Sequence, residues 1–209
     1  MTILRVSQTR HNCCEVSLSD GRAFRFHLET AMGAGFRPGC ELTEERLEEL
    51  LHVSELCLAR EYALKLLAAR ACSRKRLTER LAERFDRDVA EETAGLMAEA
   101  GLVDDAEYAF MLAADMLRLK RYGDSRVIRE LRQKGISRED AVEALERAYE
   151  EFPEDIPDEE ERIRELLRLR GVDLSDERQK RRAVDQLIRL GYDYGDIRRA
   201  AQIFEDEQY

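Results

Sequence analysis

The sequence predicts a mainly α-helical protein: three tandem three-helix repeats in an elongated curved array, preceded by a small N-terminal antiparallel β segment. Three observations support this fold class. The 209 residues include only 11 Gly and 3 Pro, so helices meet few breakers. From residue 43 onward, apolar residues recur with the helical period of about 3.6 residues. A pattern of three helices also recurs along this part of the chain.

The first 40 residues follow the two-residue period of β-strands instead. Apolar residues alternate with polar ones at Cys14, Val16 and Leu18 and again at Phe24, Phe26 and Leu28. Asp20-Gly21 between the two runs predicts a hairpin turn. Leu4 and Val6 supply a third strand, and so small a sheet needs a neighbouring element to pack against.

The remainder is predicted to be helical, with short polar caps between the helices. The predicted helices are 43–58, 60–71, 73–84, 88–100, 105–121, 124–134, 138–151, 158–170, 176–190 and 195–207. The residues expected to cap helix N-termini with a side-chain oxygen are Thr43, Ser73, Asp104, Ser137 and Asp193. Gly135 and Gly191 are expected to end the preceding helices in the left-handed conformation.

The recurrence of three-helix units is the most informative feature of the sequence. Glu61-Tyr62-Ala63 returns as Glu107-Tyr108-Ala109, 46 residues later. The middle helices carry Leu81, Leu131 and Leu187, at intervals of 50 and 56 residues. The third helices carry the apolar stripes Val89-Thr93-Leu96, Ala141-Leu145-Ala148 and Ile197-Ala200-Phe204. Because such units are small for independent cores, we expect neighbouring units to share interfaces.

These patterns divide the chain into four parts. Residues 1–58 hold the β segment and a connecting helix, 59–103 the first repeat, 104–152 the second, and 153–209 an acidic linker with the third. Residues 151–161 contain seven acidic residues, two prolines and no base. This composition predicts a loose linker.

The overall composition restricts the class of protein. The 45 acidic and 35 basic residues give a net charge of −10, which disfavours indiscriminate polyanion binding. No apolar run of 18 residues occurs, so we expect no membrane-spanning helix. An odd count of five Cys and the absence of a secretory signal favour a reducing cytoplasm, where we expect a monomer.

Positive charge is nevertheless concentrated around the middle helix of each repeat. Residues 65–87 hold eight Lys or Arg against three acids, 118–138 eight against two, and 178–199 seven against three. Such stripes are either solvated faces balanced by neighbouring acids, or contacts to acidic protein surface or phosphate. The candidate partner-binding residues are Arg70, Lys75, Arg76, Arg80, Lys120, Arg121, Arg126, Arg129, Arg132, Lys134, Arg178 and Arg182.

No motif supports catalysis, a cofactor or a metal. Cys13 and Cys14 lie near His11 but point to opposite faces of a strand, and no CxxC pair completes a tetrahedral site. Asp104-Asp105 fits a helix cap better than a catalytic pair, because no His follows His52. Gly33-x-Gly35 lacks the remaining residues of a nucleotide-binding loop. We therefore expect a protein that is not an enzyme.

Three motifs carry a resemblance to a known family. The first is Tyr62–Leu81 (YALKLLAARACSRKRLTERL), and the second is Gly101-Leu102-Val103-Asp104-Asp105 followed by Tyr108-Ala109. The third is the segment from Tyr122-Gly123 to Leu131, followed by Lys134-Gly135-Ile136. Together and in this order, the three motifs resemble those of the regulatory protein RecX family. The resemblance extends over almost the whole chain. The first repeat departs from the pattern, since Arg84-Phe85 stands where Lys-Gly is expected.

The resemblance implies three tandem three-helix repeats, no catalysis, and binding within the groove of the RecA recombinase filament. Such a regulator modulates, and mostly inhibits, recombinase, ATPase and damage-response activities, and it can meet single-stranded DNA inside the filament. A direct single-stranded DNA-binding protein is the alternative, although the net charge and the scarcity of stacking aromatics oppose it. A generic helical scaffold for peptides is a third possibility.

Overall fold

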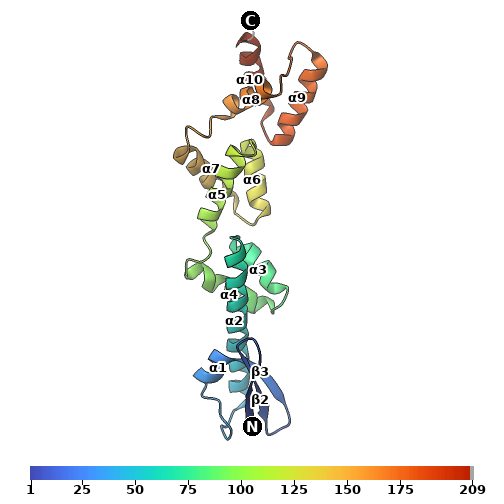
Figure 1. Cartoon of the computed structure of the whole chain (residues 1–209). Coiled ribbons are helices and arrows are strands. Elements are labelled where there is room, and N and C mark those ends of the chain that lie inside the picture. Colours follow the sequence, from blue (N-terminus) through green and yellow to red (C-terminus); the bar gives the residue numbers. More distant parts are fainter. Residues whose placement is uncertain (208–209) are drawn as a thin grey trace. The chain divides into compact units, whose positions relative to one another are not determined.

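The computed structural model describes residues 1–207, and side chains as far as residue 202. Over this range it contains ten helices and one three-stranded sheet, so the predicted mainly helical fold class is confirmed (Figure 1). The chain forms two compact units, residues 1–103 and the part that begins at Asp104. In residues 1–207, no helix has both the length and the apolar character needed to cross a bilayer.

The predicted hairpin and third strand form an antiparallel sheet in the order β1-β2-β3. The strands are β1 (Ile3–Gln8), β2 (Cys13–Leu18) and β3 (Ala23–His27). Gly21 takes a φ of 88° in the turn between β2 and β3, a conformation that glycine adopts without strain. A register shift between Ile3 and Arg5 accompanies the exposure of Leu4, while Ile3 is buried.

A short helix that the sequence did not predict follows the sheet. The alternating pattern placed Leu28 on the strand, but α1 (Leu28–Gly33) begins there. The Nδ1 atom of His27 accepts a hydrogen bond from the backbone N–H of Glu29 at 3.3 Å, and so caps the first turn. Strand periodicity does not reveal this histidine cap, because an imidazole is not among the preferred capping groups.

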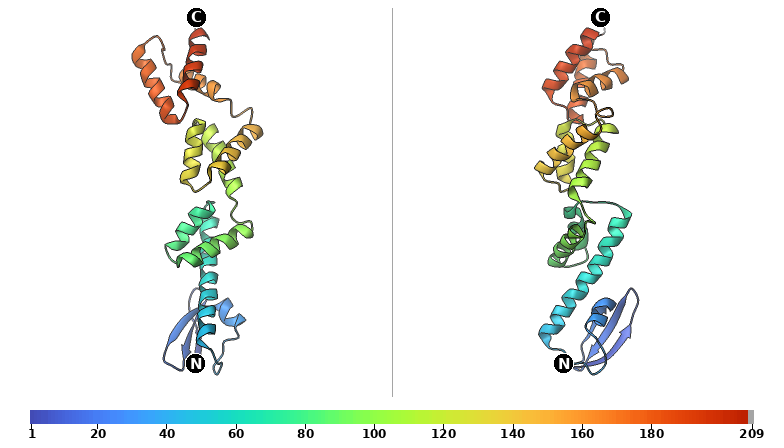
Figure 2. Two further views of the ribbon diagram at one scale, coloured as in Figure 1. Left: turned by 180° about the vertical axis from the view of Figure 1, so that it is seen from behind. Right: turned by 90° about the vertical axis from the view of Figure 1, so that its left-hand side faces the viewer.

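Helix α2 (Glu44–Ala69) is continuous where two helices, 43–58 and 60–71, were predicted, so that prediction is wrong (Figure 2). No glycine or proline lies between the two predicted segments, and propagating a helix costs less than starting a new one. Thr43 caps its N-terminus as predicted, accepting from the N–H of Arg46 at 3.1 Å. The predicted boundary between residues 58 and 59 falls inside this helix.

Helix α2 contributes to two separate hydrophobic clusters. Leu47 and Leu50 pack with Val16 and Phe26 of the sheet. In the second half of α2, Ala63 joins a second cluster, which also contains residues of α3 and α4. The sheet therefore finds in α2 the neighbour that it needs, and the same helix is the first helix of the first repeat.

The repeats are built as the sequence predicts, around a buried leucine of each middle helix. Leu81, Leu131 and Leu187 are exposed by 0%, 0% and 1%. The remaining helices are α3 (Arg74–Ala82), α4 (Arg87–Glu99), α5 (Asp105–Arg118), α6 (Asp124–Gln133), α7 (Arg138–Glu151), α8 (Glu159–Leu169), α9 (Glu177–Leu190) and α10 (Tyr194–Glu207). Gly135 and Gly191 have φ values of 94° and 96° after the middle helices, as expected.

One residue of the predicted apolar stripes faces solvent. Leu96 is 42% exposed, whereas the adjacent Met97 is 3% exposed and belongs to the core. The buried face of α4 follows Val89, Thr93 and Met97 at intervals of four, rather than the predicted mixture of four and three. The side chain of Phe204 lies outside the described residues.

The acidic segment 151–161 is not the loose linker that its composition predicts. Ile156 is 3% exposed and belongs to the core of the second repeat. Its backbone N–H donates to the carbonyl of Phe152 at 2.9 Å, and Asp155 pairs with Arg118 at 2.8 Å. The segment is highly charged, but it is held in place by the burial of one isoleucine and by the backbone hydrogen bonds of one turn.

The second and third repeats touch through two glycines. The N–H of Gly123 donates to the carbonyl of Leu190 at 2.9 Å, and a Cβ atom on Gly123 would lie 2.5 Å from the backbone of Gly191. We expect Gly123→Ala to lower the free energy of unfolding by about 1–3 kcal/mol, because backbone atoms must move apart. Thermal unfolding followed by circular dichroism measures the resulting loss of several degrees in Tm.

Gly33→Ala is the matched control. Gly33 ends α1 with an ordinary φ, and no heavy atom lies within 4 Å of the added Cβ. Alanine is the better helix former, so we expect an unchanged or slightly higher Tm. Equal Tm losses in the two variants would contradict the steric explanation.

Candidate partner-binding surface

Helix α6 presents an apolar face to the core of the second repeat and an arginine-bearing face to solvent. Val127 and Leu131, four residues apart, are fully buried. Arg129 and Arg132 project from the other side of the helix and are exposed. Their direction follows from the helical period once the two core positions are fixed.

A third arginine joins this pair in the structure. Arg138 is the first residue of α7, and the turn at Gly135 brings it beside α6. Arg129, Arg132 and Arg138 line a groove of about 590 Å³. The other lining residues are Ser125, Ile128 and Gln133. Arg138 belongs to the basic stretch 118–138 but was not among the candidate residues, since the sequence does not show that the turn brings it beside α6.

These three guanidinium groups are not neutralised within the described chain. Among residues 1–202, whose side chains the structure describes, no salt bridge joins Arg129, Arg132 or Arg138 to a carboxylate. A guanidinium offers planar paired donors that match a carboxylate or a phosphate. The groove is therefore suited to an anionic group from outside the described chain, and we call these three residues the α6 arginine groove.

Two of the predicted residues of the first repeat have carboxylate partners. Arg76 pairs with Glu79 at 2.9 Å, and Arg80 lies 3.8 Å from Glu83. Exposed pairs of this kind contribute little to stability and can be exchanged for other partners. Arg70 and Lys75 are exposed, Arg70 at the C-cap of α2 and Lys75 in the first turn of α3.

Two predicted residues of the second repeat contact the third repeat and are only partly exposed. Arg121 pairs with Glu165 of α8 at 3.0 Å. Arg126 donates to the carbonyl of Arg189 at 2.8 Å, and its guanidinium lies 3.9 Å from the ring centroid of Tyr122. These contacts give Arg121 and Arg126 structural roles between repeats, which spacing on α6 does not reveal.

The last four predicted residues lie at helix ends or on α9. Lys120 lies 5.5 Å from the Tyr122 ring centroid, and half-buried Lys134 is the C-cap of α6. Arg178 and Arg182 are exposed on α9. Of the twelve predicted residues, the structure therefore brings Arg129 and Arg132 into one groove.

A buried arginine that is not among the predicted residues joins the second and third repeats. Arg162 of α8 is 2% exposed. Its guanidinium donates to the Tyr149 hydroxyl at 2.7 Å, the carbonyl of Pro157 at 2.6 Å and the Asp124 carboxylate at 2.9 Å. The Tyr149 hydroxyl in turn donates to Asp124 at 2.7 Å. A buried charge requires such partners, and these come from both repeats.

Glu159 completes this cluster. Its carboxylate accepts the backbone N–H of Asp124 at 2.8 Å and lies 3.7 Å from Arg162. Burial raises the pKa of Glu159 to about 7, and the negative charge of Asp124 acts in the same direction. Burial likewise raises the pKa of Tyr149 above its ordinary value, so this phenol stays protonated. The cluster thus holds more acidic groups than its single guanidinium neutralises.

Three-helix repeats that enclose small cores define this chain as a helical-repeat protein. Comparison with known proteins extends this classification. The family profile described as RecX, second three-helix domain, matches residues 104–145. This range covers α5, α6 and the first part of α7, and thus includes the α6 arginine groove.

The relatives of known name agree. The regulatory protein RecX of Stenotrophomonas maltophilia (strain R551-3) is 36% identical over 151 residues, which are 69% of this chain and 86% of that protein. That of Clostridioides difficile (strain 630) is 26% identical over 200 residues, 94% and 92% of the two chains. That of Mycobacteroides abscessus is 42% identical over 85 residues, 40% of this chain and 42% of the relative. The chain belongs to the RecX family of regulatory proteins.

Solved structures show the same fold. A crystal structure of regulatory protein RecX superposes with a TM-score of 0.71 at 19% identity and covers 98% of both chains. The crystal structure of RecX from Lactobacillus salivarius gives a TM-score of 0.61 at 19% identity, over 73% of this chain and 98% of that one. At this identity the likeness concerns the fold alone.

The raised pKa of Glu159 predicts a pH-dependent stability. The folded state binds this proton more tightly than the unfolded state, whose carboxyl has a pKa near 4.5. The stabilisation is therefore complete below about pH 4.5 and is lost as the pH rises through about 7. A glutamine at this position cannot ionise, so Glu159→Gln does not lose this stabilisation as the pH rises. We expect the difference in Tm, variant minus parent, to be more positive at pH 8 than at pH 5.

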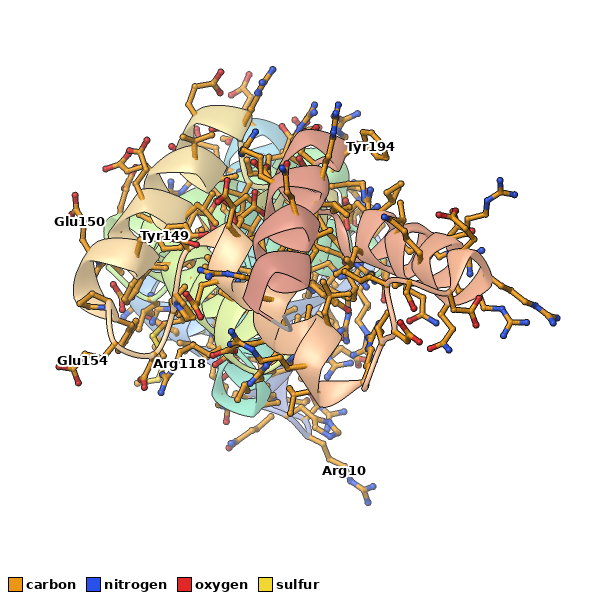
Figure 3. All side chains as sticks on the ribbon, turned by 90° about the horizontal axis from the view of Figure 1, so that it is seen from above. Arg10, Arg118, Tyr149, Glu150, Glu154 and Tyr194 are labelled. Carbon is orange, nitrogen blue, oxygen red and sulfur yellow. The ribbon has the colours of Figure 1, made fainter. Side chains whose placement is uncertain are left out.

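Thermal unfolding of both proteins at the two pH values tests this expectation. Glu154→Gln is the control, because Glu154 is exposed in the same acidic segment and points away from the ribbon (Figure 3). Its effect on Tm is expected to be small and the same at both pH values. A Glu159→Gln effect that does not change with pH would show that this carboxyl does not titrate in the range.

Proposed function

We propose that this protein binds the RecA nucleoprotein filament and inhibits its recombinase, ATPase and damage-response activities. Membership in the RecX family of regulatory proteins supports this proposal, since the family resemblance implies RecA as the regulated partner. In this proposal the protein acts as a cytoplasmic monomer without catalysis. Its binding modules are the three repeats, at residues 59–103, 104–152 and 153–209.

The α6 arginine groove is the proposed contact on the second repeat. Three unneutralised guanidiniums in a chain with a net charge of −10 favour a local anionic partner over a general attraction to polyanions. Acidic side chains on RecA, or phosphates accessible in the filament groove, have the required chemistry. Lys75 of the first repeat and Arg178 and Arg182 of the third are exposed candidate cations, which we propose as further contacts.

The central experiment measures ATP hydrolysis by RecA on single-stranded DNA, with and without this protein. We expect inhibition at amounts of this protein below the amount of RecA, because a repeat protein that touches adjacent protomers affects more than one subunit. Unchanged ATP hydrolysis at equimolar protein would contradict the proposed function.

Direct binding to single-stranded DNA is the second candidate function, because the α6 arginine groove also suits phosphate. Filament and bare DNA are compared at two salt concentrations. Under the main proposal, bare DNA binds weakly and with a steep salt dependence, while filament binding persists at about 0.2 M salt. Equal binding of both at that salt concentration would favour the DNA-binding alternative.

Charge reversal of the groove tests its role. We expect Arg129→Glu with Arg132→Glu to weaken filament binding by about tenfold or more, because attraction becomes repulsion at two positions. Glu is nearly as good a helix former as Arg. Its charge in the last turn of α6 costs about 0.3–1 kcal/mol through the helix dipole, so the fold should persist. Circular dichroism checks folding, and equilibrium titration of the filament measures binding.

The control is Arg10→Glu with Arg37→Glu, which changes the net charge equally. Both residues are exposed outside the repeats, and Arg10 extends away from the ribbon (Figure 3). Arg147 is unsuitable because it pairs with Glu107 and Glu151 and lies 3.8 Å from the centroid of Phe110. If the groove variant folds and inhibits RecA as well as the parent does, the groove is only a solvated face.

A further inference from the structure

Three side chains of the N-terminal part bring together an imidazole, a thiol and a carboxylate. The ligand atoms of His27, Glu29 and Cys57 all lie within 4.8 Å of one another. His27 ends β3, Glu29 lies in the first turn of α1, and Cys57 lies on α2. His27 is 6% exposed, Cys57 is half-buried and Glu29 is exposed. The cluster is therefore anchored inside the fold and open on one side.

The surroundings of His27 orient its ring as in metal-binding histidines. Its Nε2 atom lies 3.2 Å from the Oε1 atom of Glu61, which also accepts from the Asn12 amide at 2.7 Å. Nδ1 of His27 accepts the backbone N–H of Glu29. A ring nitrogen that accepts carries no proton, so the N–H of the imidazole lies on Nε2 and points at Glu61. A carboxylate that holds the outer nitrogen in this way is typical of histidine ligands.

This arrangement leaves Nδ1 of His27 with a lone pair on the side of the cluster. Its present partner, the backbone N–H of Glu29, is 3.3 Å away, which is a long hydrogen bond. The Cys57 sulfur accepts from the Thr30 hydroxyl at 3.7 Å, a contact that a thiolate also accepts. Glu29 lies 4.0 Å from Arg60, in an exposed pair of small energetic value. A bound metal ion would replace the contacts of Nδ1 and of Glu29, and it would leave the hydrogen bond from Thr30 to Cys57 in place.

We infer that His27, Glu29 and Cys57 form a Zn²⁺ site. Imidazole and thiolate ligands favour zinc over magnesium or calcium, and metal–ligand bonds of about 2.0–2.3 Å place tetrahedral ligands about 3.5 Å apart. The exposed Glu29 side chain closes the remaining gap. Three protein ligands leave a fourth position for water, and the bound ion connects β3 and α1 to α2. The inference is independent of the proposed function.

Co²⁺ is the spectroscopic probe for this site, used with the tag-free full chain under reducing conditions. We expect one Co²⁺ per chain, a thiolate-to-cobalt charge-transfer absorption and displacement by Zn²⁺. Zn²⁺ is expected to raise the Tm, because it binds the folded state. Absence of the charge-transfer absorption at saturating Co²⁺ would overturn the inference.

Variants identify the ligands. Cys57→Ser is expected to abolish the charge-transfer absorption, and His27→Asn to abolish tight binding while keeping a side chain that caps helices. Glu61→Gln should weaken Zn²⁺ binding by about 10–100-fold, as expected of a residue that orients a ligand. Cys40→Ser is the matched control, because Cys40 is another half-buried thiol and lies outside the cluster.

The Tm without metal shows whether each variant folds. Unchanged absorption in Cys57→Ser, or its loss in Cys40→Ser, would assign the metal to another thiol and overturn the inference. If Cys57→Ser does not fold, His27→Asn and Glu61→Gln decide by the same metal titration, and unchanged affinity in both would overturn the inference.

Discussion

The complete burial of a leucine in each middle helix determines the orientation of the residues around it. Leu81, Leu131 and Leu187 occupy the centres of three small cores. Each of these leucines packs in a cluster with buried apolar residues of the neighbouring helices, so the middle helix cannot rotate without exposing apolar surface. The arginines between the core positions must then face outward. The outward direction of the basic stripes is therefore a consequence of core packing. The stripes differ from one another in whether a carboxylate neutralises their arginines.

Much of the architecture could be predicted from the sequence because it depends on local chemistry. Asp104 and Ser137 accept from the N–H groups of Glu107 and Asp140, as their spacing predicted. The features that sequence did not reveal depend on partners distant in the chain. Arg162 directly follows the acidic segment 151–161, and its guanidinium is satisfied by Asp124, 38 residues earlier. The α6 arginine groove needs a turn to bring a residue of the next helix beside the predicted pair.

The contact between the second and third repeats shows how a charged interface can be specific. Gly123 and Gly191 allow two backbones to approach, while Arg162 requires a particular arrangement of acceptors. Replacing such a cluster by apolar side chains often costs no stability, so its value lies in geometry. Hydrophobic contacts alone tolerate sliding, whereas a buried guanidinium has a fixed set of donor directions. Hydrogen bonds of Arg162 and the close approach of two glycine backbones therefore join these two repeats.

The continuity of helix α2 links the two hydrophobic clusters of the N-terminal unit. Its first half is part of the sheet cluster and its second half is part of the first repeat. The two halves share one continuous hydrogen-bonded backbone, so melting of the whole helix exposes residues of both clusters. The sheet and the first repeat should therefore open together on the timescale of amide hydrogen exchange, as one foldon. A shared helix thus joins a β segment and a helical repeat into a single cooperative unit.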